Sequence, residues 1–210
     1  MSYHQYRPLN PNELPLVTKN IIIINVLLYI FSHFIISNID IGKYLNLYYF
    51  SLPSFKPHQL ITHMFMHANI GHILFNMIGL YIFGANLENL WGPKRFLNFY
   101  LVCGLAAAFA QIIFCYVSNT PSIMLGASGA IAGLMGASWV LFPNTEISFA
   151  FFPIPFKLKY FVPLYIFISW YSGYNAYYGD NTAHFAHIGG LLTGAIIVLI
   201  WNKTNRNSFY

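Results

Sequence analysis

The sequence predicts an all-α polytopic membrane protein, a bundle of six transmembrane helices, from its composition and its hydropathy pattern. Asp, Glu, Lys and Arg make up only 7% of the 210 residues, whereas a soluble domain carries about 25%. Hydrophobic residues reach 57% and aromatic residues 19%, and so few charges could not cover the surface of a small globule. This excludes a soluble enzyme and a disordered chain. The ten basic residues form no dense cluster, which excludes a nucleic-acid-binding domain.

Six apolar segments are the expected spans, because about 20 mostly apolar residues cross a hydrocarbon core about 30 Å thick. Pro143 ends the fourth and makes it short, whereas Pro163 is tolerated in the first turn of the fifth. We expect a membrane domain over residues 19–202, between cytoplasmic tails at 1–18 and 203–210. The expected spans cover residues 20–36, 60–87, 96–117, 128–142, 160–177 and 183–201.

The distribution of basic residues predicts the orientation of the chain, because short cytoplasmic loops are enriched in Lys and Arg. With the N-terminus inside, the outer loops hold only Lys43 and Lys56. Both termini are therefore expected to face the cytoplasm. The outer loop 37–56 is rich in apolar and aromatic residues, which fits a segment lying in the membrane interface and a plain tether equally well. The basic residues on the inner side are Arg7, Lys19, Lys94, Arg95, Lys157, Lys159, Lys203 and Arg206.

Polar side chains at membrane depth are costly, so each invites a functional hypothesis. None of the five acidic residues lies well inside an expected span. The functional candidates among the polar residues of the second, fourth and sixth spans are histidines, an asparagine and a serine. They are His63, His67, His72, Asn76, Ser128, His184 and His187.

Ser128 and His187 are expected at the same depth below the outer surface. The fourth span is about 22 Å long, so Ser128 at its outer end lies several ångströms inside a core about 30 Å thick. His187 lies about one turn into the sixth span. Residues 118–127 must then enter the membrane as non-helical backbone, which survives only where protein or a water-filled cavity surrounds it.

Small residues at four-residue spacing predict that the fourth and sixth spans approach closely. Gly129 and Gly133 form one such pair, followed by Ala132 and Gly136. The sixth span matches them, and His187 shares its small-residue face. By themselves such glycines usually do no more than pack helices. The small residues of the sixth span are Ala186, Gly190 and Gly194.

His72 and Asn76 lie four residues apart and share one face of the second span. Each side chain can donate a hydrogen bond, and donors aimed at one point would stabilise an oxyanion. Hydrogen bonding between helices is an equally good explanation for such residues.

These motifs together resemble the rhomboid intramembrane serine proteases in their six-span bacterial form. The resemblance covers residues 57–202 and includes Glu88 followed by Gly92. It rests on residues 67–77 (HANIGHILFNM), 126–136 (GASGAIAGLMG) and 186–190 (AHIGG).

The resemblance implies Ser128 as the nucleophile and His187 as its general base. His72, Asn76 and the Ser128 amide would form the oxyanion hole. It further implies cleavage of single-span membrane substrates near the outer face, gating by the fifth span and the loop 177–182, and residence in a bacterial inner membrane. No cofactor or metal is expected.

The sequence departs from the family pattern at two places. His58 and Gln59 stand where many members have Trp followed by Arg or Gln, and Ala132 stands where some have an aromatic residue that packs on the catalytic histidine. Both changes bear on gating and on histidine orientation, and neither removes a reacting group.

Without a nearby carboxylate the chemistry must run on a serine–histidine dyad, with the histidine oriented by packing. A metal enzyme built on the histidines is the first alternative, but no HExxH motif is present. A transporter or channel is the second, and it would be expected to show repeats or a charged pathway. His63, His67 and His184 are left without a catalytic role.

Overall fold

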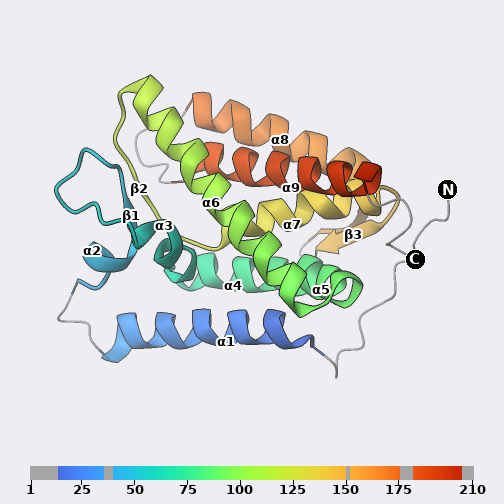
Figure 1. Cartoon of the computed structure of the whole chain (residues 1–210), viewed down its shortest axis with the longest axis horizontal. Coiled ribbons are helices and arrows are strands. Elements are labelled where there is room, and N and C mark those ends of the chain that lie inside the picture. The colour runs from blue at the N-terminus through green and yellow to red at the C-terminus, as the bar shows by residue number, and fades with distance from the viewer. Residues whose placement is uncertain (1–13, 36–39, 150–151, 176–181, 205–210) are drawn as a thin grey trace.

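The computed structural model of the chain describes residues 14–35, 40–149, 152–175 and 182–204. They form a helical bundle with a small two-stranded sheet toward each end (Figure 1). The longer helices are α1 (Leu16–Ile30), α4 (Ile70–Gly79), α5 (Ala85–Trp91), α6 (Pro93–Ser118), α7 (Ser128–Leu141), α8 (Leu158–Tyr174) and α9 (His184–Thr204). The short elements are α2 (Gly42–Leu45), α3 (Gln59–Thr62), β1 (Leu47–Tyr48), β2 (Ile123–Met124), β3 (Glu146–Phe149) and β4 (Phe152–Lys157).

Four of the described helical segments are long and apolar enough to cross a membrane. A π-helical turn extends α1 to Ile35, and another joins α4 to α5. Helix α7 is apolar but has only 14 residues, and α8 has 17. The predicted helical membrane class is confirmed, whereas the count of six spans stays a prediction. The four segments are Leu16–Ile35, Ile70–Trp91, Pro93–Ser118 and His184–Thr204.

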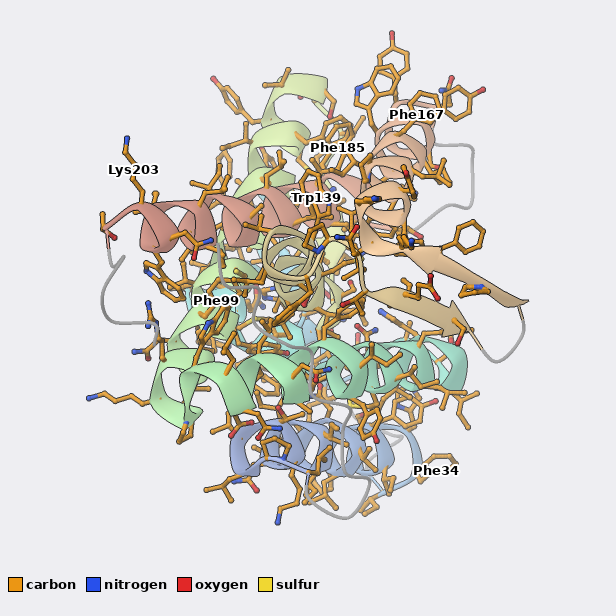
Figure 2. All side chains as sticks on the ribbon, turned by 90° about the vertical axis from the view of Figure 1, so that its right-hand side faces the viewer. Phe34, Phe99, Trp139, Phe167, Phe185 and Lys203 are labelled. Carbon is orange, nitrogen blue, oxygen red and sulfur yellow. The ribbon has the colours of Figure 1, made fainter. Side chains whose placement is uncertain are left out.

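Helix α7 lies at the centre of the bundle, between α4 and α9, with α6 crossing over it (Figure 1). Ten consecutive residues of α7, from Gly129 to Ser138, are buried on every side of the helix. The outer helices instead present apolar side chains outward, as Phe34 and Phe167 do at 74% and 59% exposure, while Phe99 lies buried (Figure 2). A short helix can stay at membrane depth here because protein, and not lipid, surrounds it.

The contact between α7 and α9 is made by glycines, as their spacing predicts. A Cβ added to Gly190 would lie 2.0 Å from the carbonyl oxygen of Gly129, and one added to Gly194 would lie 2.1 Å from that of Gly133. A Cβ on Gly136 would lie 2.2 Å from the carbonyl oxygen of Leu191. The two backbones therefore touch directly, which only residues without a side chain allow.

The predicted start of the second span, near residue 60, is wrong. Helix α3 and a 3-10 turn (His63–Phe65) precede an extended residue, and the long helix begins only at Ile70. Asn69 caps that helix, because its side-chain oxygen accepts a hydrogen bond from the His72 amide at 2.9 Å. His63 and His67 therefore do not share a helix with His72.

The segment between α6 and α7 is non-helical from Asn119 to Ala127, as predicted except at Ser118, which ends α6; its depth in a membrane stays a prediction. Its strand β2 pairs antiparallel with β1 from the outer loop. The Gly126 amide donates to the carbonyl of His63 at 2.8 Å, and the Tyr49 amide donates to the carbonyl of Ser122 at 3.2 Å. The backbone groups are thus satisfied by protein, as they must be at membrane depth.

Neither small sheet was predicted. The outer loop contains α2 and β1, its place in the membrane interface stays a prediction, and residues 36–39 of that loop lie outside the described part. At the other end β3 pairs with β4 as a hairpin between α7 and α8. Strands of two to six residues leave no period long enough to recognise in the sequence.

Glu88 connects the end of α5 to the beginning of α1. Its carboxylate is 3% exposed and accepts hydrogen bonds from the amides of Val17 at 2.8 Å and Thr18 at 2.7 Å. The first amides of a helix lack intrahelical partners and carry a partial positive charge, so a carboxylate stabilises them. The predicted tail and domain boundaries stay predictions, and residues 1–13 and 205–210 lie outside the described part.

We expect Gly194→Val to destabilise the bundle by about 3 kcal/mol, because the added carbons would meet the Gly133 backbone. Thermal unfolding of the purified protein in detergent measures the effect. Ile196→Val is the matched control, since Ile196 lies on the same helix and is 54% exposed. Equal melting temperatures for the two variants would contradict the backbone contact.

Candidate active site

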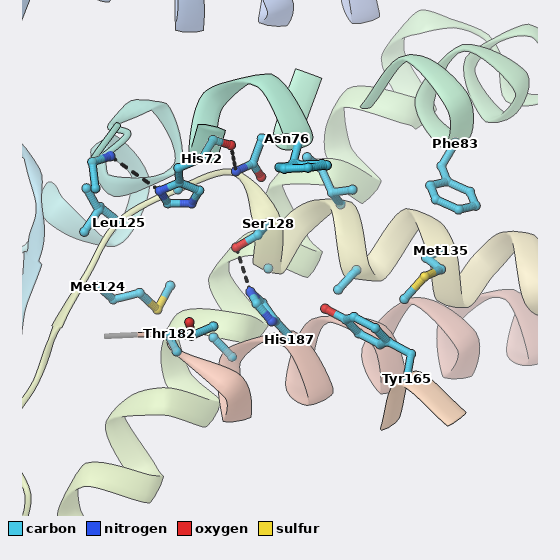
Figure 3. Close-up of a pocket in the computed structure, with 18 of the residues that line it drawn as sticks. His72, Asn76, Phe83, Met124, Leu125, Ser128, Met135, Tyr165, Thr182 and His187 are labelled. Atoms are coloured by element: carbon cyan, nitrogen blue, oxygen red, sulfur yellow. Dashed lines mark hydrogen bonds between the residues drawn. The ribbon is translucent and has the colours of Figure 1, made fainter. Parts of the chain in front are cut away.

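Ser128 and His187 meet although 59 residues separate them in the chain. Ser128 is the first residue of α7, and His187 lies in the first turn of α9. The His187 Nε2 atom lies 2.8 Å from the Ser128 Oγ atom, within hydrogen-bond distance (Figure 3). The glycine contact below them produces this distance, because it fixes both the spacing and the register of the two helices.

Aromatic rings hold the His187 side chain from two sides. The Tyr165 ring of α8 stacks on it with centroids 6.2 Å apart and an interplanar angle of 30°. The His184 ring meets it edge-on at 6.4 Å. Within the described residues no carboxylate is hydrogen-bonded to His187, and the buried Glu88 is committed to α1. Packing therefore takes the orienting role that an aspartate has in a catalytic triad.

His72 presents a ring nitrogen to the backbone just before Ser128. A Cβ on Gly126, whose φ is +113°, would lie 2.6 Å from the His72 Nε2 atom. The Ala68 amide donates to His72 Nδ1 at 3.4 Å, which leaves the proton of a neutral ring on Nε2. The N–H of His72 consequently faces the entrance of α7 (Figure 3).

Asn76 lies one turn further along α4 and faces the same space. Its Nδ2 group donates to the His72 carbonyl at 2.8 Å, and an amide carries a second N–H for another acceptor. The sequence-predicted residues Ser128, His187, His72 and Asn76 all line one cavity of about 620 Å³. Its further lining includes Phe75, Phe83, Met124, Met135, Phe161 and Tyr165.

His63 and His67 are not among the residues that line this cavity. His63 is buried, with its Nδ1 atom 2.8 Å from the Gln59 carbonyl, and its own carbonyl anchors Gly126. The buried His67 ring packs edge-on against His72 at 5.0 Å. Across the described residues, no group of three or more His, Cys, Asp or Glu side chains could hold a metal ion.

Gln59, which the sequence singled out with His58, and Tyr165, which the sequence did not indicate, both support the site. The amide of the buried Gln59 ties the outer loop together, accepting from the Lys56 amide and donating to the Ser54 carbonyl, each at 3.0 Å. The Tyr165 ring stacks on His187. Ala132, which stands where some family members have an aromatic residue, has only a small side chain. No spacing rule could have found Tyr165, because it comes from a different helix. The His58 Nε2 atom lies 2.9 Å from the Tyr44 carbonyl oxygen.

A half-buried serine–histidine pair inside a cavity of an apolar helical bundle, with hydrogen-bond donors facing the same cavity, defines a helical membrane protein with a potential nucleophile. The model of the rhomboid domain matches residues 54–203. The chain belongs to the rhomboid family and is a multi-pass membrane protein.

Curated relatives agree with this assignment. RHOMBOID-like protein 12, mitochondrial, of Arabidopsis thaliana is 33% identical over 79% of this chain and 52% of its own length. Rhomboid protease GluP of Bacillus subtilis is 31% identical over 65% of this chain and 24% of its own. Rhomboid protease GlpG of Haemophilus influenzae is 27% identical over 71% of this chain and 72% of its own. The chain spans about half the length of the two Arabidopsis mitochondrial relatives it matches, 52% and 48%.

Because these relatives include mitochondrial proteins as well as bacterial ones, the bacterial inner membrane stays a prediction, and so does the cytoplasmic placement of both termini.

We expect Gly126→Ala to slow the labelling of Ser128 by a fluorophosphonate by about tenfold or more, because displaced reacting groups lose rate steeply. A Cβ there meets His72 and the backbone has a positive φ. Gel-based labelling rates measure the effect. Gly71→Ala is the control, since its Cβ would have only an ordinary contact, at 3.4 Å. Labelling at the wild-type rate in Gly126→Ala would contradict a role for the close contact between Gly126 and His72 in positioning Ser128.

Proposed function

We propose that the chain is an intramembrane serine endopeptidase that uses a Ser128–His187 dyad to cleave transmembrane substrate helices near the outer membrane face. The observation that carries this proposal is the 2.8 Å contact between the serine and histidine inside a cavity of the bundle. The names of the GluP and GlpG relatives, both rhomboid proteases, support the same class of reaction.

The reaction begins when Ser128 Oγ attacks the scissile carbonyl and His187 Nε2 accepts its proton. The imidazolium then gives that proton to the leaving amine, which departs from the acyl-enzyme. Water, deprotonated by His187, attacks the ester and releases the second product. Because the dyad lacks a carboxylate, the stacked Tyr165 ring and the neighbouring His184 keep the imidazole in its reacting pose.

The oxyanion of the tetrahedral intermediate would be stabilised by three donors. His72 offers Nε2–H from beside Gly126, and Asn76 offers its second amide hydrogen. The Ser128 amide is the first of α7, so it has no intrahelical partner and lies at the positive end of the helix dipole. Donors fixed before the reaction cost no reorganisation when the charge develops.

A substrate would reach Ser128 as an extended segment, because a helical backbone has its carbonyls bonded internally. Phe83, on the π-helical turn between α4 and α5, and Phe161, on α8, both line the cavity. Separation of the two segments that carry them would admit a transmembrane segment from the bilayer, in keeping with the family's gate in the fifth span. Residues 177–181 of the predicted loop gate lie outside the described part.

The alternative of a transporter or channel has no observation in its favour. The lining of the cavity, as far as the structure describes it, contains no carboxylate, lysine or arginine that could form a charged pathway.

Ser128→Ala is expected to abolish cleavage of a model transmembrane substrate in liposomes, a loss of about 10⁴-fold or more. His187→Ala should do the same, because the proton acceptor is gone. Ser138→Ala is the control, since Ser138 is a buried serine of α7 outside the cavity. Cleavage by Ser128→Ala at the wild-type rate, or sensitivity to chelators in place of fluorophosphonates, would overturn the proposal.

Asn76→Ala is expected to lower kcat by about 10²-fold to 10³-fold with little change in KM, because its donor acts on the transition state. Steady-state cleavage at several substrate concentrations separates the two constants. Asn86→Ala is matched to it, since Asn86 donates to the Ile82 carbonyl at 2.8 Å in the same way but lies outside the cavity. An unchanged kcat in Asn76→Ala would remove Asn76 from the oxyanion hole.

A further inference from the structure

A second cavity of about 510 Å³ lies where α5 meets α6, against the last turns of α9. It shares no lining residue with the cavity around Ser128, so it is a separate site. We call it the basic groove. Its lining residues are Trp91, Gly92, Pro93, Lys94, Arg95, Asn98, Phe99, Val102, Ile197 and Trp201.

One end of the basic groove is cationic. Lys94 is exposed there, and the Arg95 guanidinium lies 3.8 Å above the centre of the Trp201 ring. No acidic residue is among the lining residues that the structure describes. The neighbouring Glu88 is buried and holds the amides of α1, so its charge is not offered to the groove.

The other end of the basic groove is apolar. Phe99, Val102 and Ile197 continue the lining along α6 and α9. Val102 is 46% exposed and lies seven residues beyond Arg95, about 10 Å along the helix. Charge therefore gives way to hydrocarbon over about the length of a glycerophosphate unit and the start of an acyl chain.

Two tryptophans mark the boundary between these ends. Trp91 and Trp201 pack edge-on with ring centroids 5.3 Å apart. Tryptophan prefers the level of the lipid headgroups, where one side of the ring is apolar and the other is wet. The order of cation, indole and aliphatic side chain therefore follows the order of phosphate, glycerol and acyl chain in a phospholipid.

We propose that the basic groove binds an anionic phospholipid, with its phosphate beside Lys94 and Arg95 and an acyl chain along Val102 and Ile197. Basic pockets between membrane helices bind such headgroups on the side of the membrane where positive charge gathers. The positive-inside distribution of this chain predicts the same side for Lys94 and Arg95. The bound lipid bridges α6 and α9, the helix that carries His187.

The test is lipid binding to the full chain in dodecylmaltoside, followed by native mass spectrometry. Palmitoyl-oleoyl phosphatidylglycerol is expected to bind about 25-fold more tightly than the matching phosphatidylcholine, because each of the two cations contributes about fivefold. Lys94→Gln should weaken phosphatidylglycerol binding about fivefold, the effect of one charge near a headgroup. Equal affinity for the two lipids would overturn the proposal.

Lys19→Gln is the matched control for charge. Lys19 is exposed in the first turns of α1, which Glu88 holds at the same end of the bundle as Trp91. The Lys19→Gln substitution removes one positive charge outside the groove, so it should leave phosphatidylglycerol binding unchanged. A loss equal to that of Lys94→Gln would show attraction to the whole surface, and would overturn a defined site.

Val102→Trp tests the apolar end with both cations intact. The larger side chain should fill the groove and remove phosphatidylglycerol binding, while thermal unfolding in lipid-free detergent stays as in the wild type, because Val102 is partly exposed. Unchanged lipid binding in this variant would overturn the acyl-chain position. Inorganic phosphate at equal concentration should not compete, and full competition by it would identify a free-phosphate site in place of a lipid site.

Discussion

The backbones of α7 and α9 touch through glycines, and the rest of the structure depends on this contact. Added carbons at Gly190 or Gly194 would lie 2.0 or 2.1 Å from carbonyl oxygens of α7. At that separation the helices have one register, because a shift by one residue would place a side chain against backbone. The same register sets the 2.8 Å distance between Ser128 and His187. The same glycine contacts therefore determine both how α7 packs on α9 and how far Ser128 lies from His187.

The burial of α7 explains how polar chemistry is tolerated at membrane depth. The helix is surrounded by protein, so its serine and the extended segment before it need no lipid-facing surface. Strand β1 pairs with β2 of that segment, and the His63 carbonyl accepts a hydrogen bond from its Gly126 amide. Exposed backbone in hydrocarbon would cost several kcal/mol for each unsatisfied group. The outer loop therefore helps to hold the segment that leads into Ser128.

The scarcity of carboxylates shapes both the proposed chemistry and the scaffold. The buried Glu88 carboxylate accepts hydrogen bonds from the first amides of α1, which compensate its negative charge. Within the described residues no carboxylate is hydrogen-bonded to His187, so aromatic packing from Tyr165 orients the imidazole ring. An uncompensated carboxylate in the bundle would raise the cost of the fold. A dyad held by packing avoids that cost.

The sequence by itself determined the membrane class, the small-residue faces and the group of polar residues that line the cavity, because hydropathy and helical periodicity are local properties. Ser128 and His187 could be paired from their expected depth together with the small-residue faces beside them. Only the tertiary structure decided that α4 begins at Ile70 and that β1 pairs with β2. It also decided that Tyr165 stacks on His187 and that Gln59 is hydrogen-bonded to the outer loop. These depend on contacts between segments far apart in the chain, for which no local period exists.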